Sequence, residues 1–142
     1  MSPTTVMAFD FGRVRTGVAI GDLQVGVAHP LETVAAPDEE QRLRAVEALV
    51  REWAPGRFVV GLPTRDDGAA HPMAEAVRAF GASLEARFGC PVAYVDESLS
   101  SFAAGLALTD NGIRGRRQKR HLDSAAAQVI LQAYLDEHHA SA

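Results

Sequence analysis

Acidic residues occupy three places in this sequence where their chemistry would be of use. Asp10 lies within the apolar run VMAFDF, Asp96 and Glu97 follow the apolar run VAYV, and Asp123 begins an apolar helical pattern. Carboxylate oxygens are the preferred protein ligands of Mg²⁺ and Mn²⁺. Two such ions about 3.5–4 Å apart can clamp the attacking and leaving oxygens of a phosphodiester. The chemistry to test for is therefore metal-dependent phosphodiester hydrolysis.

Asp10 carries the strongest of these signals. In an extended strand Val6, Ala8 and Asp10 share one face, while Met7 and Phe9 share the other, so the carboxylate interrupts a segment suited to burial. Burying an unpaired carboxylate costs several kcal/mol, which favours a metal or another partner. The alternative is an Asp that caps the turn at Gly12, although capping residues usually follow an apolar run and do not interrupt it.

The other acidic positions leave alternatives open. Side chains alternate along a strand, so only one of Asp96 and Glu97 can face the same side as Asp10, and the pattern does not say which. The pair could also be a solvated strand exit. Asp123 stands at helical spacing from Ala126, Ala127 and Ile130, which directs it toward the sheet. Its alternative role is a helix N-cap, although position 126 lacks the Glu or Gln of a capping box.

The elements that would position these residues can be read from hydrophobic periodicity. Three short apolar runs predict an antiparallel meander, and alternating helical and strand patterns follow it. This order predicts an α/β protein with a mixed five-stranded sheet and helices on its faces. The expected strands are 6–11, 16–20, 25–31, 57–62 and 91–95; the expected helices are 38–53, one around 77–88, 98–109 and 122–137, the last with Ala126, Val129, Ile130, Ala133 and Tyr134 buried.

Length and composition are those of one compact domain, expected over residues 1–142. Hydrophobic residues make up 47% and charged residues 23%, which is typical of globular proteins. No apolar stretch is long enough for a bilayer, and the start of the chain lacks the layout of a signal peptide, so we expect a cytoplasmic protein. The single cysteine, Cys90, excludes an internal disulfide and is expected to be a packed core residue.

A basic segment directly precedes the last predicted helix and is expected to be a loop over 111–120. Five of its seven residues at 114–120 are cationic in a chain of net charge −4, and this concentration beside the acidic positions favours a phosphate-binding role over a merely solvated face. His121 could assist proton transfer, although it is more simply an ordinary loop histidine. The predicted nucleic-acid-binding residues are Arg13, Arg15, Arg114, Arg116, Arg117, Lys119 and Arg120.

Four segments together resemble the YqgF (RuvX-like) family over nearly the whole chain. They are AFDFGRVRTGVAIGD, VVGLP with Asp67-Gly68 beyond it, DESLSS and DSAAAQVILQAYL. The resemblance implies an RNase H-like fold and a role in maturation of the small-subunit ribosomal RNA precursor. It matches Asp10, Glu97 and Asp123 to the acidic catalytic and metal-binding positions, and so selects Glu97 over Asp96. The family's usual Arg after the glutamate is Ser98 here.

Several functions therefore compete. The expected one is an Mg²⁺- or Mn²⁺-dependent nuclease acting on RNA, and a Holliday junction resolvase acting on four-way DNA is the runner-up. Symmetric junction cleavage requires a dimer, and most apolar helix positions are needed for packing, although a stripe at 99–106 leaves a homodimer open. A non-catalytic nucleic-acid-binding module is a third possibility. A sugar-kinase-like phosphotransferase ranks lower, because those enzymes enclose ATP between two such domains.

Overall fold

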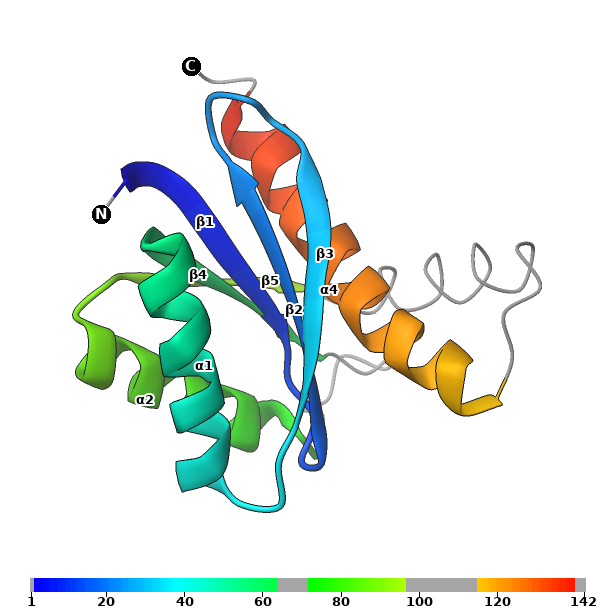
Figure 1. The fold of residues 1–142 in the computed structure, drawn as a ribbon. Coiled ribbons are helices and arrows are strands. Elements are labelled where there is room, and N and C mark those ends of the chain that lie inside the picture. Colours follow the sequence, from blue (N-terminus) through cyan, green and yellow to red (C-terminus); the bar gives the residue numbers. More distant parts are fainter. Residues whose placement is uncertain (1, 64–71, 97–114, 140–142) are drawn as a thin grey trace.

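The computed structural model describes residues 2–63, 72–96 and 115–139, and it contains one five-stranded sheet with helices on both faces (Figure 1). The strand order is β3-β2-β1-β4-β5. β1 pairs antiparallel with β2, and β2 with β3, while β4 pairs parallel with β1 and with β5. The predicted meander and the mixed five-stranded sheet are both confirmed. The strands are β1 Ser2–Asp10, β2 Arg15–Asp22, β3 Ala28–Ala35, β4 Pro55–Leu62 and β5 Val92–Asp96.

The third strand begins later than the sequence predicts, at Ala28 and not at residue 25. Val25 belongs instead to the turn, where the Asp22 carboxylate accepts hydrogen bonds from the backbone N–H of Gln24 at 2.8 Å and of Val25 at 3.4 Å. Gly26 follows with a φ of 78°, a conformation that favours glycine. Asp side chains commonly accept hydrogen bonds from the backbone N–H groups that follow them in a turn. Because the Val25 N–H is bonded in this way, Val25 is part of the turn and not of the strand.

The alternation predicted for β1 divides the core into two layers. Met7 and Phe9 belong to one buried cluster, with Phe58 and Phe80, and Val6 and Ala8 belong to the other, with Ala127 and Ile130. The first layer lies under helices α1 (Glu39–Trp53) and α2 (Ala74–Phe88), and the second under α4 (Gly115–His139). Each face of the sheet is therefore covered by different helices (Figure 1).

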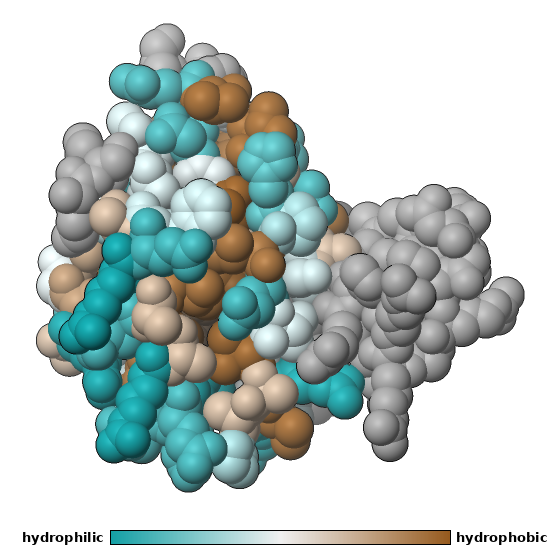
Figure 2. All heavy atoms as spheres, in the orientation of Figure 1, coloured by the Kyte–Doolittle hydropathy of each residue, from teal (hydrophilic) through white to brown (hydrophobic). Residues whose placement is uncertain are grey.

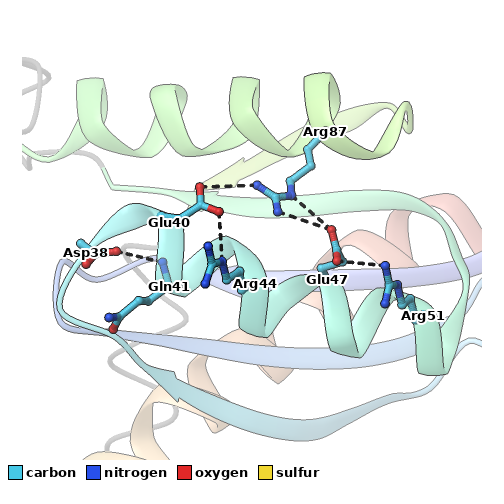
Figure 3. A network of polar contacts seen from close by, with 7 residues as sticks. All are labelled: Asp38, Glu40, Gln41, Arg44, Glu47, Arg51 and Arg87. Carbon is cyan, nitrogen blue, oxygen red and sulfur yellow. Dashed lines mark hydrogen bonds and ion pairs between the residues drawn. The ribbon is translucent and has the colours of Figure 1, made fainter.

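Helices α1 and α2 are joined to each other by side-chain ion pairs on their outer surface (Figure 3). Arg87 of α2 lies 3.4 Å from Glu47 and 3.8 Å from Glu40 of α1. The predicted start of α1 is confirmed, since the Asp38 carboxylate accepts a hydrogen bond from the backbone N–H of Gln41 at 2.9 Å. Hydrophilic side chains cover the outer side of α1 in the space-filling view (Figure 2).

The last helix corrects two predictions. The segment expected to be a loop over 111–120 is helical from Gly115 onward, and so α4 begins earlier than the predicted residue 122. Arg, Gln and Lys are good helix formers, and nothing after Gly115 interrupts the helix, so their charge does not prevent helix formation. Ala133 is exposed and Val129 only half-buried, because the buried stripe runs through Ala127, Ile130, Leu131, Tyr134 and Leu135.

Cys90 is a core residue, as predicted, with 3% of its surface exposed. Burial raises the pKa of its thiol, which keeps the sulfur protonated and unreactive. Among the described residues no helix is both long and apolar enough to cross a membrane. The helix predicted over 98–109 lies outside the described residues.

Candidate active site

Asp10 lies at the carboxyl end of β1, half-buried, on the face that α4 covers. Its partner on β2 is Gly17, and the pairing of Phe9 with Val60 puts Gly61 of β4 beside it on the other side. Both neighbours of the carboxylate in the sheet therefore lack side chains. On the α4 face, the adjacent strands therefore place no side chain directly beside the Asp10 carboxylate.

The pairing of β5 decides which side Asp96 faces. Ala93 and Val95 pack with the core layer under α4, whereas Val92 packs with the layer under α1 and α2. Tyr94 points to the same face as Val92, because its hydroxyl lies against Gly81 of α2. A Cβ added at Gly81 would be 2.2 Å from the Tyr94 hydroxyl oxygen. Residues two apart in a strand share a face, so Asp96 points to the same side as Tyr94, which is the face opposite Asp10.

Helix α4 runs antiparallel to β1, with its amino-terminal half toward the end of the strand that carries Asp10 (Figure 1). The direction is set by glutamines: Gln128 Nε2 donates to the carbonyl of Ala28 at 3.1 Å, and Gln132 Nε2 donates to the carbonyl of Gly26 at 2.9 Å. Earlier residues of α4 therefore lie farther along β3, which runs in the same direction as β1.

This direction determines the level of Asp123 along the strand. Leu131 of α4 lies beside Gly21, which pairs with Val6 of β1. Asp123 is eight residues before Leu131, about 12 Å at about 1.5 Å per helical residue. Asp10 is four residues beyond Val6, about 13 Å at about 3.3 Å per strand residue. The two distances are nearly equal, so the backbone of Asp123 comes level with Asp10. Asp123 also lies inside α4, eight residues after its first residue, and so is not the N-cap.

The turn between β1 and β2 holds the two arginines predicted near phosphate. A Cβ on Gly12 would lie 2.3 Å from the Arg15 carbonyl oxygen, so only glycine fits this turn. The buried Thr16 hydroxyl donates to the Gly12 carbonyl at 3.3 Å and fixes the turn from inside. Arg13 is exposed and its Nε lies 3.2 Å from Met73 Sδ, while Arg15 is half-buried. Arg13 is thus directed toward α2, away from the face of Asp10.

The remaining predicted site residues are described only in part. Glu97 and Arg114 lie outside the described residues. For Arg116, Arg117, Lys119, Arg120, His121 and Asp123 the helical backbone is described, but the side chains lie outside the description. Among the side chains that are described, no three His, Cys, Asp or Glu residues come together as a metal site. Within the acidic set of Asp10, Glu97 and Asp123, the structure describes the side chain of Asp10.

Sequence reasoning overlooked one charged residue near this edge of the sheet, Arg42 of α1. It is only 6% exposed, its Nη2 donates to the Arg13 carbonyl, and its guanidinium lies 4.9 Å from the centre of the Phe11 ring. A signal was present, because Arg42 stands four residues before Val46 on the buried stripe of α1. A charged residue on the buried stripe of a helix is the same kind of signal as Asp10 within the apolar run of β1.

The sequence of the chain is similar to proteins of known families. Residues 4–137 match the RuvX family, described as "Holliday junction resolvase". A protein of Nitrosospira multiformis named "Putative pre-16S rRNA nuclease" is 46% identical over 96% of this chain and 91% of its own length. A protein of Methylobacillus flagellatus with the same name is 48% identical over 92% of this chain and 90% of its own length.

Among the solved structures similar to this chain are Holliday junction resolvases. Thermus thermophilus RuvC in complex with a Holliday junction substrate superposes with a TM-score of 0.56 and 19% identity, covering 98% of both chains. The fowlpox virus Holliday junction resolvase gives a TM-score of 0.56 and 10% identity, covering 94% of this chain and 98% of its own. At such low identity these likenesses establish the fold, which is the predicted RNase H-like one.

Proposed function

The chain belongs to the RuvX family, and we propose that it is a metal-dependent nuclease that cleaves RNA in the precursor of 16S ribosomal RNA. The observation that carries this proposal is the setting of Asp10. Its carboxylate lies at the end of a central strand, on a face where both neighbours in the sheet are glycines. A half-buried carboxylate at a strand end, flanked by residues without side chains, is suited to binding a divalent cation and a phosphate together.

Glu97 and Asp123 complete the proposed acidic set with Asp10. The alternation of side chains in β5 directs Asp96 to the face opposite Asp10. This favours its neighbour Glu97 as the acidic residue near Asp10, the same choice that the family resemblance implies. The direction and rise of α4 support Asp123, whose backbone comes level with Asp10. Carboxylate oxygens fit Mg²⁺ or Mn²⁺, and two such ions would supply an activated hydroxide and stabilise the departing 3′-oxygen.

The basic residues of the first turns of α4 are proposed to bind the phosphates of the substrate. Arg116, Arg117, Lys119 and Arg120 precede Asp123 on the same helix, so they would lie along the path of a strand whose phosphodiester sits at Asp10. Replacing Arg116 and Arg117 with alanine should weaken binding to unrelated RNA sequences equally. It should also reduce the slope of log affinity against log salt by about 0.7 for each lost contact.

The decisive experiment compares two matched variants in a cleavage assay with Mg²⁺ or Mn²⁺. Asp10→Asn should reduce cleavage of precursor RNA about a thousandfold or more, because it removes a ligand of the ions that stabilise the transition state. Asp96→Asn is the control, since Asp96 belongs to the opposite face of the sheet and should leave cleavage within about twofold of wild type. An Asp10→Asn protein that folds and keeps near-normal turnover would refute the assignment.

A second candidate substrate is the four-way DNA junction, which the description of the family names. The same assay distinguishes the two, if labelled single-stranded RNA and an intact junction are compared under one metal and salt condition. We expect faster RNA cleavage by a monomer. Paired symmetric nicks in the junction would require a dimer with two-fold symmetry and would favour the resolvase. A role on the ribosomal RNA precursor also implies a cytoplasmic protein.

A further inference from the structure

A pocket of about 350 Å³ lies on the α1 and α2 side of the sheet, close to the carboxyl end of β1. Its apolar wall consists of Phe11, Pro37, Ala76, Ala79 and Phe80. The Phe11 and Phe80 rings lie 4.9 Å apart at an angle of 34°, and because Phe80 is only 1% exposed, the half-buried Phe11 is the more accessible of the two rings. This volume lies near the lower end of the range for small-molecule sites, about 300–1,000 Å³.

The pocket also contains a buried guanidinium. Arg42 lines it, and the structure records no ion pair for Arg42 within the described residues. Its Nη2 donates to the Arg13 carbonyl, but its Nε is buried without a hydrogen-bond partner. A buried donor left without a partner costs free energy, roughly 1–3 kcal/mol, and is usually retained for a reason. A ligand with a hydrogen-bond acceptor could approach the part of this guanidinium that lines the pocket.

The other polar groups of the pocket are of both signs. Arg13 lies at its mouth, and Asp38 and Glu39 line it from the start of α1. One oxygen of Asp38 accepts from the Gln41 N–H at 2.9 Å and one oxygen of Glu39 accepts from the Ser83 hydroxyl at 3.0 Å, which leaves the second oxygen of each carboxylate for another donor. Two cations and two anions sum to zero charge, so the pocket does not favour a bare phosphate.

We propose that this pocket binds one unstacked nucleobase of the substrate strand, with guanine preferred. The inference rests on the proposed nuclease function and adds a base preference to it. Guanine offers O6 and N7 as acceptors for a guanidinium, and its ring and exocyclic N–H groups can donate to a carboxylate. The half-buried Phe11 ring in the apolar wall offers an aromatic contact to an extruded base.

The pocket is close enough to Asp10 to act on the same strand. Phe11 directly follows Asp10, and Arg13 stands in the turn between β1 and β2. Two residues that line the pocket therefore lie within three positions of the candidate metal-binding residue. A single strand that crosses this edge of the sheet at Asp10 could place a neighbouring base on the other face. A fixed guanine near the cut would then orient the phosphodiester.

The test fills the pocket from α2, because Arg42 also holds the turn between β1 and β2 and its replacement could disturb folding. Ala79→Phe adds a ring at an exposed helical position that lines the pocket, and Ala82→Phe makes the same change at an exposed position of α2 that does not line it. Both variants should keep the thermal midpoint of the wild type, since exposed helix positions tolerate such changes.

Binding is measured by fluorescence anisotropy with labelled oligouridine RNAs that carry one guanosine, adenosine, cytidine or abasic site at each position in turn. EDTA is present, so the readout does not depend on cleavage and survives a failure of the nuclease assignment. At one position guanosine should raise wild-type affinity about tenfold over uridine. Ala79→Phe should remove this preference and Ala82→Phe should keep it. Equal affinity for all bases, or an abasic site that binds as tightly as guanosine, would overturn the proposal.

Discussion

The two faces of the sheet differ in the size of the side chains that the strands place on them. The face under α1 and α2 is filled by large side chains, with Phe9 packed at 5.8 Å from Phe58 and at 5.4 Å from Phe80, measured between ring centres. The face under α4 carries small residues in the strands, among them Ala8, Ala19 and Ala28. At Gly21 a Cβ would lie 3.0 Å from Leu135 of α4, so the helix packs directly on the backbone of the sheet.

This difference explains how one small fold could combine stability with the proposed active site at one edge of the sheet. The large aromatic residues bury most apolar area on the side that lacks Asp10, and burial of this kind is the main source of stability. The thin layer on the other side allows α4 to pack close to the sheet, and the direction of α4 brings the backbone of Asp123 level with Asp10. We therefore expect changes in the buried core under α1 and α2 to lower stability without affecting metal binding, and changes under α4 to affect metal binding as well.

The largest effect is expected from Leu84→Ala, on the face under α1 and α2. Leu84 is fully buried, and its truncation should lower the free energy of unfolding by about 3 kcal/mol through lost burial and a cavity. Urea unfolding measures this loss. Cleavage by the folded variant, assayed well below its melting temperature, should stay within about twofold of wild type. A tenfold loss of cleavage would show that the two faces are not independent.

A smaller loss of stability, but a larger loss of function, is expected from Ala127→Leu under α4. Ala127 is fully buried against the small residues of the sheet, so the larger side chain should cost about 2 kcal/mol and force α4 outward. The increase in melting temperature caused by Mn²⁺ should then decrease or vanish. Ala133→Leu is the matched control, because Ala133 is exposed on the same helix. Unchanged metal stabilisation in Ala127→Leu would contradict the role assigned to this thin layer.

The turn between β2 and β3, which Gln132 of α4 contacts, should make the stability depend on acid pH. Burial raises the pKa of Asp22, but hydrogen bonds from the Gln24 N–H, the Thr4 hydroxyl and the Val25 N–H outweigh burial and hold that pKa below 3.8. A lowered folded pKa stabilises the protein above the unfolded pKa of about 3.9, and this contribution is lost as pH falls through the folded pKa.

Asp22→Asn should accordingly lower the free energy of unfolding by about 1 kcal/mol at pH 7. The difference from wild type should shrink as the pH falls below about 4, where the wild-type carboxylate becomes protonated. Urea unfolding at pH 7 and at the lowest pH where the protein folds measures both values. Glu52→Gln, at an exposed position of α1, serves as the control. A difference that grows toward acid pH would have the wrong sign.

The smallest effect is expected at the ends of α1 and α2, where two equivalent positions differ in sequence. Ala54 and Gly89 both follow a helix in the left-handed conformation, with φ of 47° and 71°. A side chain is disfavoured there, so Ala54→Gly should raise the free energy of unfolding by about 0.5 kcal/mol, and Gly89→Ala should lower it by about 1 kcal/mol. Thermal unfolding measures both. Changes of the same sign would indicate that contacts, and not backbone conformation, dominate these caps.

The sequence alone determined those features that depend on short-range periodicity. Alternation in β1 assigned Met7 and Phe9 to one layer and Ala8 and Asp10 to the other, and the structure confirms it. The three-to-four residue spacing predicted α1 and α2, and Asp38 marked the start of α1. Such patterns are visible in one segment at a time, because each reflects the geometry of a single strand or helix.

Only the tertiary structure decided features that depend on pairing between distant segments. The register of β5 against β4 assigned Asp96 to the face away from Asp10, which alternation within β5 could not do alone. The direction of α4 fixed the level of Asp123, and the packing of Phe11, Arg13 and Arg42 formed a pocket from separate elements. A shift of one residue in strand register would turn every side chain of that strand to the other face. The register of β5 and the position of α4 are therefore determined by the contacts of the whole folded chain and not by the pattern of one segment.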